Sequence, residues 1–172
     1  MARAAAGDRA AWRELYLRHR DFVHRVAFRF MGNEADARDV TQDTFIAVFR
    51  NAAGYREAGK FTTYLWRAVA NRCLTEKARA WNRMRDDHEA DDGLLSVPDE
   101  RPSPEEALNA SRGQARVQAA IASLPERQRL ALVLSRYEGL GYEDIAAALS
   151  CSVSSVESLL FRARQGLLAK LR

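Results

Sequence analysis

The sequence predicts an all-α protein made of two small helical domains joined by an acidic flexible linker, with a helix-turn-helix in the C-terminal domain. Apolar residues recur three and four positions apart in both halves of the chain, and no segment alternates with the period of two typical of a strand. With 172 residues, 47% of them hydrophobic, the chain is long enough to bury a core in one domain or in two small ones.

Charge divides the chain into three segments. Residues 1–85 carry 17 basic and 9 acidic side chains, residues 86–106 carry one basic and nine acidic, and residues 107–172 carry nine basic and five acidic. The middle segment also holds three of the four prolines, the composition of a flexible linker. We therefore expect domains at 1–85 and 107–172 with a linker at 86–106. Two basic domains favour nucleic acid as a partner.

Three helices are expected in the N-terminal domain. The first carries apolar residues from Trp12 to Phe30, with Asp8 as its N-cap and Gly32 at its end. The second spans roughly residues 34–52. A polar loop then leads to a third helix from about residue 62 to residue 85.

An acidic stripe marks the second of these helices. Asp36, Asp39 and Asp43 recur at intervals of three and four residues, with Gln42 beside them. Such a stripe is most often a solvated face, and the functional interpretation is a docking face for a basic partner. A metal site or an acid–base pair is less favoured, because no histidine lies near in sequence.

Aromatic and basic residues are interleaved between residues 55 and 85. They are Tyr55, Phe61, Tyr64, Trp66 and Trp81, among Arg56, Lys60, Arg67, Arg72, Lys77, Arg79, Arg83 and Arg85. Rings that stack on unpaired bases, next to cations that hold phosphates, suit single-stranded nucleic acid. Some of these rings must belong to the core instead, Phe61 foremost.

The C-terminal domain is predicted to begin with a helix capped by Ser103 and Pro104 and running to about residue 123. Pro125 opens the next helix, which contains the apolar run Leu130–Leu134. No apolar run in the chain is longer than this one, which is too short to cross a bilayer.

A helix-turn-helix is predicted between residues 142 and 164. Ile145, Ala146 and Leu149 form one face of a short helix, a turn follows at residues 150–152, and Ser154 or Ser155 caps the second helix. The outward face of the second helix carries short hydrogen-bonding groups and a cation, which suit base edges and phosphates: Ser155, Ser158, Arg162 and Gln165. The alternative is a plain helical hairpin with a solvated polar face.

Other classes are disfavoured. Cys73 and Cys151 lie far apart and form no CxxC pair, so a disulfide scaffold and a cysteine-rich zinc site are not expected. No HExxH, GxSxG or phosphate-binding loop is present, so we expect no catalytic residue, metal or cofactor. The N-terminus lacks the pattern of a secretory signal. A reducing cytoplasm, without membrane insertion, is the expected compartment.

Three motifs in order resemble the extracytoplasmic-function (ECF) sigma factors, the promoter-recognition subunits of bacterial RNA polymerase. Residues 36–45 (DARDVTQDTF) are similar to the family's helix that docks on core polymerase. Residues 61–72 (FTTYLWRAVANR) resemble its segment for recognising and melting the minus-ten element. Residues 124–129, 142–146 and 156–164 resemble its domain for the minus-thirty-five element.

The resemblance implies roles for three sets of residues. The set implied to bind core polymerase is Asp36, Asp39, Gln42 and Asp43. The set implied to contact minus-ten DNA is Lys60, Phe61, Tyr64, Arg67, Asn71, Arg72, Lys77 and Arg79. The set implied to contact minus-thirty-five DNA is Ser154, Ser155, Glu157, Ser158, Phe161, Arg162 and Arg164.

The implied function is therefore binding to core RNA polymerase and promoter DNA, followed by promoter melting and transcription initiation. Many members of the family are also held by an anti-sigma factor, although nothing in this sequence identifies one. Two alternatives remain at this stage: a helix-turn-helix regulator that acts without polymerase docking, and a helical interaction adaptor. The regulator would not need the acidic stripe or the aromatic–basic segment, and the adaptor would show no promoter-dependent activity.

Overall fold

The computed structural model describes residues 1–52, 60–87 and 115–171. Its N-terminal helices are α1 (Ala2–Ala5), α2 (Arg9–Met31), α3 (Glu34–Arg50) and α4 (Phe61–Asp87). Residues 115–122 are helical, and α6 (Glu126–Leu132), a π-helical turn η2 (Val133–Tyr137), α7 (Tyr142–Leu149) and α8 (Val153–Leu171) follow. The all-α prediction is confirmed, since these ranges contain no strand.

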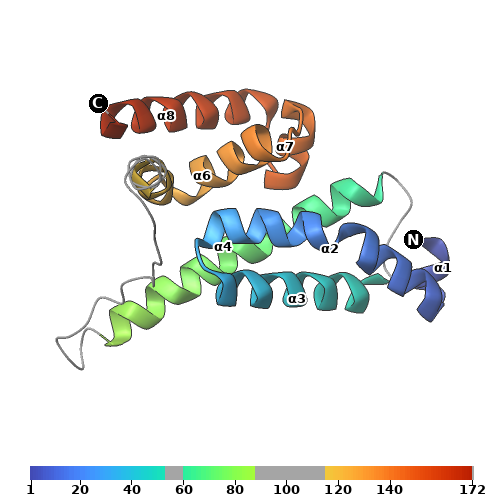
Figure 1. Cartoon of the computed structure of the whole chain (residues 1–172). Helices are drawn as coiled ribbons and strands as arrows, with labels where there is room; N and C mark the ends of the chain where they lie inside the picture. Colours follow the sequence, from blue (N-terminus) through green and yellow to red (C-terminus); the bar gives the residue numbers. More distant parts are fainter. Residues whose placement is uncertain (53–59, 88–114, 172) are drawn as a thin grey trace, which may run out of the picture.

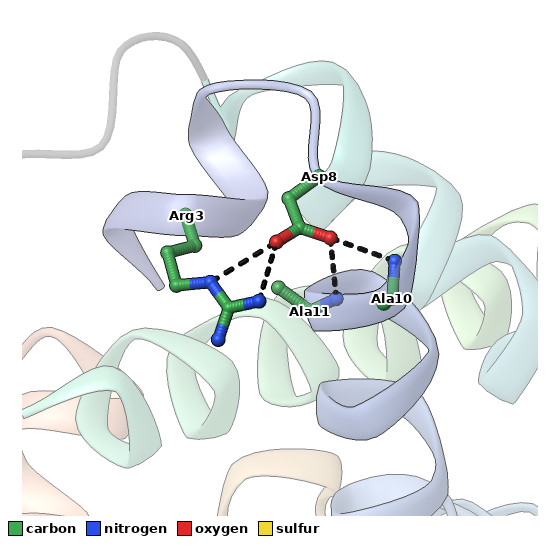
Figure 2. Close-up of polar contacts among 4 residues, drawn as sticks. All are labelled: Arg3, Asp8, Ala10 and Ala11. Carbon is green, nitrogen blue, oxygen red and sulfur yellow. Dashed lines mark hydrogen bonds and ion pairs between the residues drawn. The ribbon is translucent and has the colours of Figure 1, made fainter.

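The start of α2 is fixed by the predicted N-cap. The Asp8 carboxylate accepts hydrogen bonds from the backbone N–H groups of Ala10 at 2.9 Å and Ala11 at 3.1 Å. Its other oxygen pairs with the Arg3 guanidinium of α1 at 2.7 Å (Figure 2). The N–H of Ala11 and the Arg3 guanidinium hold the pKa of Asp8 below its usual value. Gly32 ends the helix in the left-handed conformation, with φ of 87°.

Helices α2, α3 and α4 pack around a shared core. Figure 1 shows α2 and α3 side by side, with the long α4 crossing them. The most buried side chains include Val23, Val26 and Phe30 of α2, Val40 and Val48 of α3, and Leu65 and Val69 of α4. Each series follows helical spacing, so one apolar stripe on each helix faces the others.

The helix-turn-helix forms as predicted, with one correction. Helices α7 and α8 meet at 97°, and Ala146 and Val156 are buried where they cross. Ser150 makes the turn with φ of 51°, the only positive φ of a non-glycine residue in the described ranges. The prediction that Ser154 or Ser155 caps α8 is wrong: the helix begins one turn earlier, and Ser152 Oγ accepts the Ser155 N–H at 3.2 Å.

The two halves of the described chain pack against each other, which the sequence left open. One continuous core cluster contains Phe30, Leu65 and Val69 from the N-terminal half and Leu134 and Ile145 from the C-terminal half. Helix α7 lies against α4, and α8 lies on the far side of α6 and α7 from the N-terminal helices (Figure 1).

Polar contacts also join the halves. The Glu138 carboxylate, whose side chain is 3% exposed, pairs with Arg25 and Arg29 of α2, each at 3.1 Å. The Arg129 guanidinium of α6 stacks on the Phe30 ring of α2, 4.3 Å from its centroid. These contacts connect α2 with both ends of the α6–η2 segment.

Some predictions fall beyond the described ranges. Residues 88–106 of the expected linker, the expected start of the helix at Ser103, and Tyr55 and Arg56 all lie outside the described residues. In the part of the chain that is described, no single helix has the length and apolar character to cross a membrane, and the bent pair α7 and α8 meets that test only when the two are taken together.

Candidate nucleic-acid interface

The predicted recognition face of α8 is exposed. Every residue assigned to minus-thirty-five DNA is solvent-accessible: Ser154, Ser155, Glu157, Ser158, Phe161, Arg162 and Arg164. A surface hollow of about 400 Å³ lies at the N-terminal half of this face, lined by Ser154, Ser155, Ser158 and Arg162. Short hydroxyl side chains next to a guanidinium can approach both base edges and phosphates.

The structure adds Arg127 to this face. Arg127, in the first turn of α6, lines the same hollow, and its Nη2 donates to the carbonyl oxygen of Leu149 at 2.7 Å. This bond ties the start of α6 to the end of α7. Sequence reasoning missed Arg127 because it lies 35 positions before Arg162, and only the packing of α6 against α8 brings them together.

A second hollow lies between α3 and α4. It measures about 310 Å³, and its lining includes four residues assigned to minus-ten DNA: Tyr64, Arg67, Asn71 and Arg72. Asn51 and Thr75 complete its polar lining, although neither was predicted. The positions 64, 67, 68, 71, 72 and 75 share one face of α4 by helical spacing, which is the signal that would have added Thr75.

The remaining minus-ten residues do not line this hollow. Lys60 is exposed just before α4, and Phe61 is half-buried with its ring edge-on to His19 at 5.3 Å. Phe61, expected to be the foremost core ring of this segment, packs against the core but is only half-buried. Lys77 and Arg79 lie further along α4, where Arg79 pairs with Glu76 at 3.5 Å.

Two of the cations in the second hollow already have protein partners. Arg67 Nε donates to the carbonyl oxygen of Ala147 in α7 at 3.1 Å, and Arg72 pairs with Asp43 of α3 at 3.3 Å. Both bonds hold α4 against a neighbouring helix. A phosphate that binds these guanidinium groups through the same N–H groups must replace those bonds.

The acidic stripe on α3 separates into different environments. Asp36 accepts from Asn33 Nδ2 at 2.8 Å within the N-cap of the helix, and Asp43 faces α4 through its pair with Arg72. Asp39 and Gln42 are exposed. The stripe is therefore not one uniformly free face, and Asp39 and Gln42 are its accessible members.

An aromatic groove that the sequence did not predict runs beside Gln42. It lies between α2 and α3, has a volume of about 840 Å³, and is lined by Trp12, Tyr16, Phe45 and Phe49. Phe49 is 59% exposed. Four arginines also line it, at positions 13, 20, 38 and 50. The sequence did indicate an exposed apolar surface here, because these aromatic residues cover a wider face of their helices than a single buried stripe would.

Metal chemistry finds no support in the described ranges, where no group of three histidine, cysteine, aspartate or glutamate side chains has the geometry to hold a metal ion. Cys73 is buried, and burial raises the pKa of its thiol to about 12.

Two known family models match this chain. A family model described as sigma-70 region 2 matches residues 15–83, and one described as sigma-70, region 4 matches residues 114–167. The first match contains α3 and most of α4, and the second contains α6, α7 and most of α8.

Curated relatives match over nearly the whole chain. The ECF RNA polymerase sigma factor SigE of Mycolicibacterium smegmatis is 43% identical over 166 residues, covering 95% of this chain and 63% of the relative. The RNA polymerase sigma-H factor of Pseudomonas aeruginosa is 34% identical over 170 residues, covering 96% of this chain and 88% of the relative. The chain thus spans less than two thirds of the length of SigE.

Solved structures show the same arrangement of helices. CnrH in complex with the cytosolic domain of CnrY matches with a TM-score of 0.69 and 28% identity, over 99% of this chain and 93% of that chain. The sigma factor RpoE of Bartonella quintana, in complex with the anti-sigma factor NepR, also gives a TM-score of 0.69, over 94% of this chain and 96% of that chain. Its identity of 19% supports the fold alone. With both sigma-70 regions present and curated relatives above 30% identity, the chain belongs to the ECF family of RNA polymerase sigma factors.

Proposed function

We propose that this protein is a cytoplasmic, non-enzymatic transcription initiation factor that binds core RNA polymerase and directs it to promoters. The observation that carries the proposal is the helix-turn-helix, whose second helix exposes hydroxyl and guanidinium groups around one hollow. Membership of the sigma-factor family is the reason to propose promoter DNA as the ligand of this face.

The minus-thirty-five element is assigned to α8. Its N-terminal half would enter the major groove, where Arg162 is suited to bidentate contact with a guanine and Glu157 to accepting from cytosine N4. Arg127 would hold a phosphate at the rim of the hollow, because it lines that hollow from α6. The remaining residues of this set are Ser154, Ser155, Ser158, Phe161 and Arg164.

The minus-ten element is assigned to the first half of α4. The hollow lined by Tyr64, Asn71 and Arg72 combines a ring, an amide and a cation, the groups that stack on, hydrogen-bond and anchor an unpaired base. Capture of a flipped base would offset an unstacking cost of a few kcal/mol, so no ATP-driven step is needed to open the duplex. Lys60, Phe61, Arg67, Lys77 and Arg79 complete this set.

The binding of core polymerase is assigned to α3. Asp39 and Gln42 are exposed there, and the aromatic groove begins at Gln42. Asp36 and Asp43 belong to the same proposed set, with Asp43 also holding α4 through Arg72. An apolar groove next to polar groups is a common form of helix-docking surface.

Promoter binding would require the two halves to separate. Two turns of duplex span about 68–72 Å, while α7 packs directly on α4 in the structure. The 21 residues 86–106, fully extended, reach roughly 70 Å. We therefore propose domains at 1–85 and 107–172 that come apart on DNA while the connecting segment spans the gap.

Reconstituted transcription tests the proposal. Core polymerase with the purified full chain should give promoter-specific transcripts from DNA of the source organism, whereas core polymerase alone should not. Specific DNA binding by the full chain with no gain in transcription would contradict the proposal and favour a helix-turn-helix regulator that acts without polymerase.

A further inference from the structure

A cleft where the two halves meet has an unusual charge. Its volume is about 650 Å³, within the usual range for small-molecule sites, and it lies between α2, residues 115–122 and the α6–η2 segment. Its cationic and imidazole lining residues are His24, Arg25, Arg29 and Arg129, and none of the described residues lining it is acidic. Phe28 and Tyr137 add partly exposed rings.

Arg129 is the most unusual member of this lining. The residue is only 3% exposed, its Nη1 donates to the Ala122 carbonyl oxygen at 3.0 Å, and its guanidinium lies over the Phe30 ring. Its Nε and Nη2 are shielded from solvent and have no hydrogen-bond partner within the described part of the chain. Burying a charged group with unpaired donors is unfavourable, and most proteins avoid it.

The two unpaired donors form one recognition element. In a guanidinium group the N–H of Nε and one N–H of Nη2 point in the same direction, and this pair matches two oxygens of a carboxylate or phosphate. The third nitrogen, Nη1, is already bound to the backbone of residue 122. The unpaired side of Arg129 therefore has the shape of a bidentate anion site, although it is shielded from solvent in this structure.

Nearby groups do not neutralise this charge. Glu126 lies one turn earlier on α6, is exposed, and forms no ion pair with Arg129 in the described structure. Cys73 of α4 is also near, but with a pKa of about 12 its buried thiol is neutral at physiological pH. Glu138 is saturated by Arg25 and Arg29. Burial accordingly lowers the pKa of Arg129 from its usual value.

We propose that this cleft binds a small organic anion, a carboxylate or phosphate on an apolar body, whose two oxygens accept from Nε and Nη2 of Arg129. The apolar body lies against the partly exposed rings of Phe28 and Tyr137. Because Nε and Nη2 are shielded, binding requires a rearrangement that exposes them to the anion.

Such a ligand would hold the halves together. It contacts α2 on one side and residues 115–122 and α6 on the other, so it binds only the packed arrangement and stabilises that arrangement by mass action. If the chain acts as proposed above, the ligand lowers promoter engagement by opposing separation. That last step rests on the proposed function, whereas the binding itself does not.

Thermal denaturation of the full chain tests the site without polymerase or DNA. The probes are sodium benzoate and phenyl phosphate, with benzyl alcohol as the neutral analogue and sodium chloride to match ionic strength. We expect at least one anion to raise the melting temperature by about 3 °C or more at tenfold excess over its dissociation constant. A rise with benzoate identifies a carboxylate site, and a rise with phenyl phosphate alone identifies a phosphate site.

Two variants separate specific binding from a general salt effect. Arg129→Lys keeps the charge but loses the paired donors, and Ala119→Trp fills the cleft from an exposed position that lines it without altering Arg129. Both should lose the rise, while Arg136→Lys, an exposed control on η2, should keep it. If Arg129→Lys does not fold, the rise in melting temperature of the Ala119→Trp variant alone decides whether the anion binds in the cleft. An equal rise in Ala119→Trp, or no rise in the unmodified chain, overturns the proposal whether or not the protein initiates transcription.

Discussion

Arg67 of α4 donates a hydrogen bond through Nε to the backbone carbonyl oxygen of Ala147 in α7, at 3.1 Å. The same guanidinium lines the hollow that we assign to the minus-ten element. One N–H cannot serve both the carbonyl and a phosphate at full strength. Packing of the two halves and binding of promoter DNA should therefore compete at this residue.

Glu138→Gln should loosen the packing of the two halves. The carboxylate is nearly buried and holds both Arg25 and Arg29, so removing its charge leaves two guanidinium groups without their anion. We expect a loss of about 1–3 kcal/mol in the free energy of unfolding and a larger radius of gyration. Urea denaturation and small-angle X-ray scattering measure these quantities.

A matched control for Glu138→Gln lies on α2. Among the residues that the structure describes, Glu14 pairs with Arg18 alone, and both side chains are 63% exposed. Glu14→Gln should change stability by less than about 0.5 kcal/mol and leave the radius unchanged. Equal effects of the two substitutions would show that the contact at Glu138 does not join the halves in solution.

Asp39→Ala should weaken association with core polymerase. Asp39 is exposed on α3 and makes no ion pair or side-chain hydrogen bond with another described residue, so the melting temperature should stay within about 1–2 °C of the unmodified chain. Asp43→Ala should also destabilise the chain, because Asp43 anchors Arg72 of α4. Polymerase affinity and thermal melting of both variants distinguish the two roles. Glu143→Gln, exposed on α7, serves as the control and should retain affinity.

Arg162→Ala should impair binding to minus-thirty-five DNA. If the guanidinium is bidentate to a guanine, the substitution costs about 1–3 kcal/mol and relaxes the preference at that base pair. If it contacts phosphate alone, the loss is uniform across sequences and the salt dependence becomes shallower. Lys170→Ala removes an equal charge from the far end of the same helix. DNA affinity of both variants is measured by titration at several salt concentrations. Equal losses of affinity would show that Arg162 is not part of the recognition face.

Ser150→Gly should stabilise the chain. Ser150 adopts φ of 51° and ψ of 53° at the turn between α7 and α8, a conformation that costs a residue with a Cβ about 1–2 kcal/mol. Part of that gain is offset by the greater freedom of glycine in the unfolded chain, so we expect a net increase of about 0.5–1 kcal/mol. Ser154→Gly, inside the first turn of α8, should have the opposite sign. Urea denaturation compares the two.

Stability should fall on acidification partly because of His19. Burial lowers the pKa of His19 below its ordinary value of 6.5, and the charge of Arg18 lowers it further. The folded state then binds fewer protons at this site than the unfolded state, so its contribution is complete above pH 6.5 and is lost as the pH falls. His19→Phe keeps a ring against Phe61 and cannot be protonated. The unfolding free energy of the His19→Phe variant should depend less steeply on pH than that of the unmodified chain. An unchanged slope would show that His19 does not contribute to the loss of stability at low pH.

Local sequence signals predicted the helices, and the residues that α8 exposes, well. Asp8 and Gly32 act at the ends of α2 as their residue types indicate, and α8 exposes Ser155, Ser158 and Arg162 at the predicted spacing. These features depend on interactions within a few positions, so the sequence carries them directly.

Contacts between distant segments could not be predicted in this way. Asp43 and Arg72 were assigned to separate partners, because helical spacing does not show that α3 and α4 bring them together. Arg129 was taken as part of a motif, yet its burial depends on Phe30, 99 positions earlier. Apolar residues of α7 satisfied the pattern of a helix-turn-helix core, and nothing in that pattern indicated that the same core continues into α4.

The π-helical turn η2 sets the register of the C-terminal half. Arg129 and Glu138 both contact α2, although nine positions separate them. An uninterrupted α-helix would place two such residues about 180° apart, on opposite sides, whereas one extra residue in a wide turn brings them to about 80°. If Val133–Tyr137 closed to a regular α-helical turn with no residue removed, Glu138 would rotate away from Arg25 and Arg29, whereas deleting one residue together with the π-turn would keep the angle at about 80°. The π-helical geometry of this one turn, rather than the identity of its side chains, thus determines whether Arg25 and Arg29 of α2 can pair with the Glu138 carboxylate.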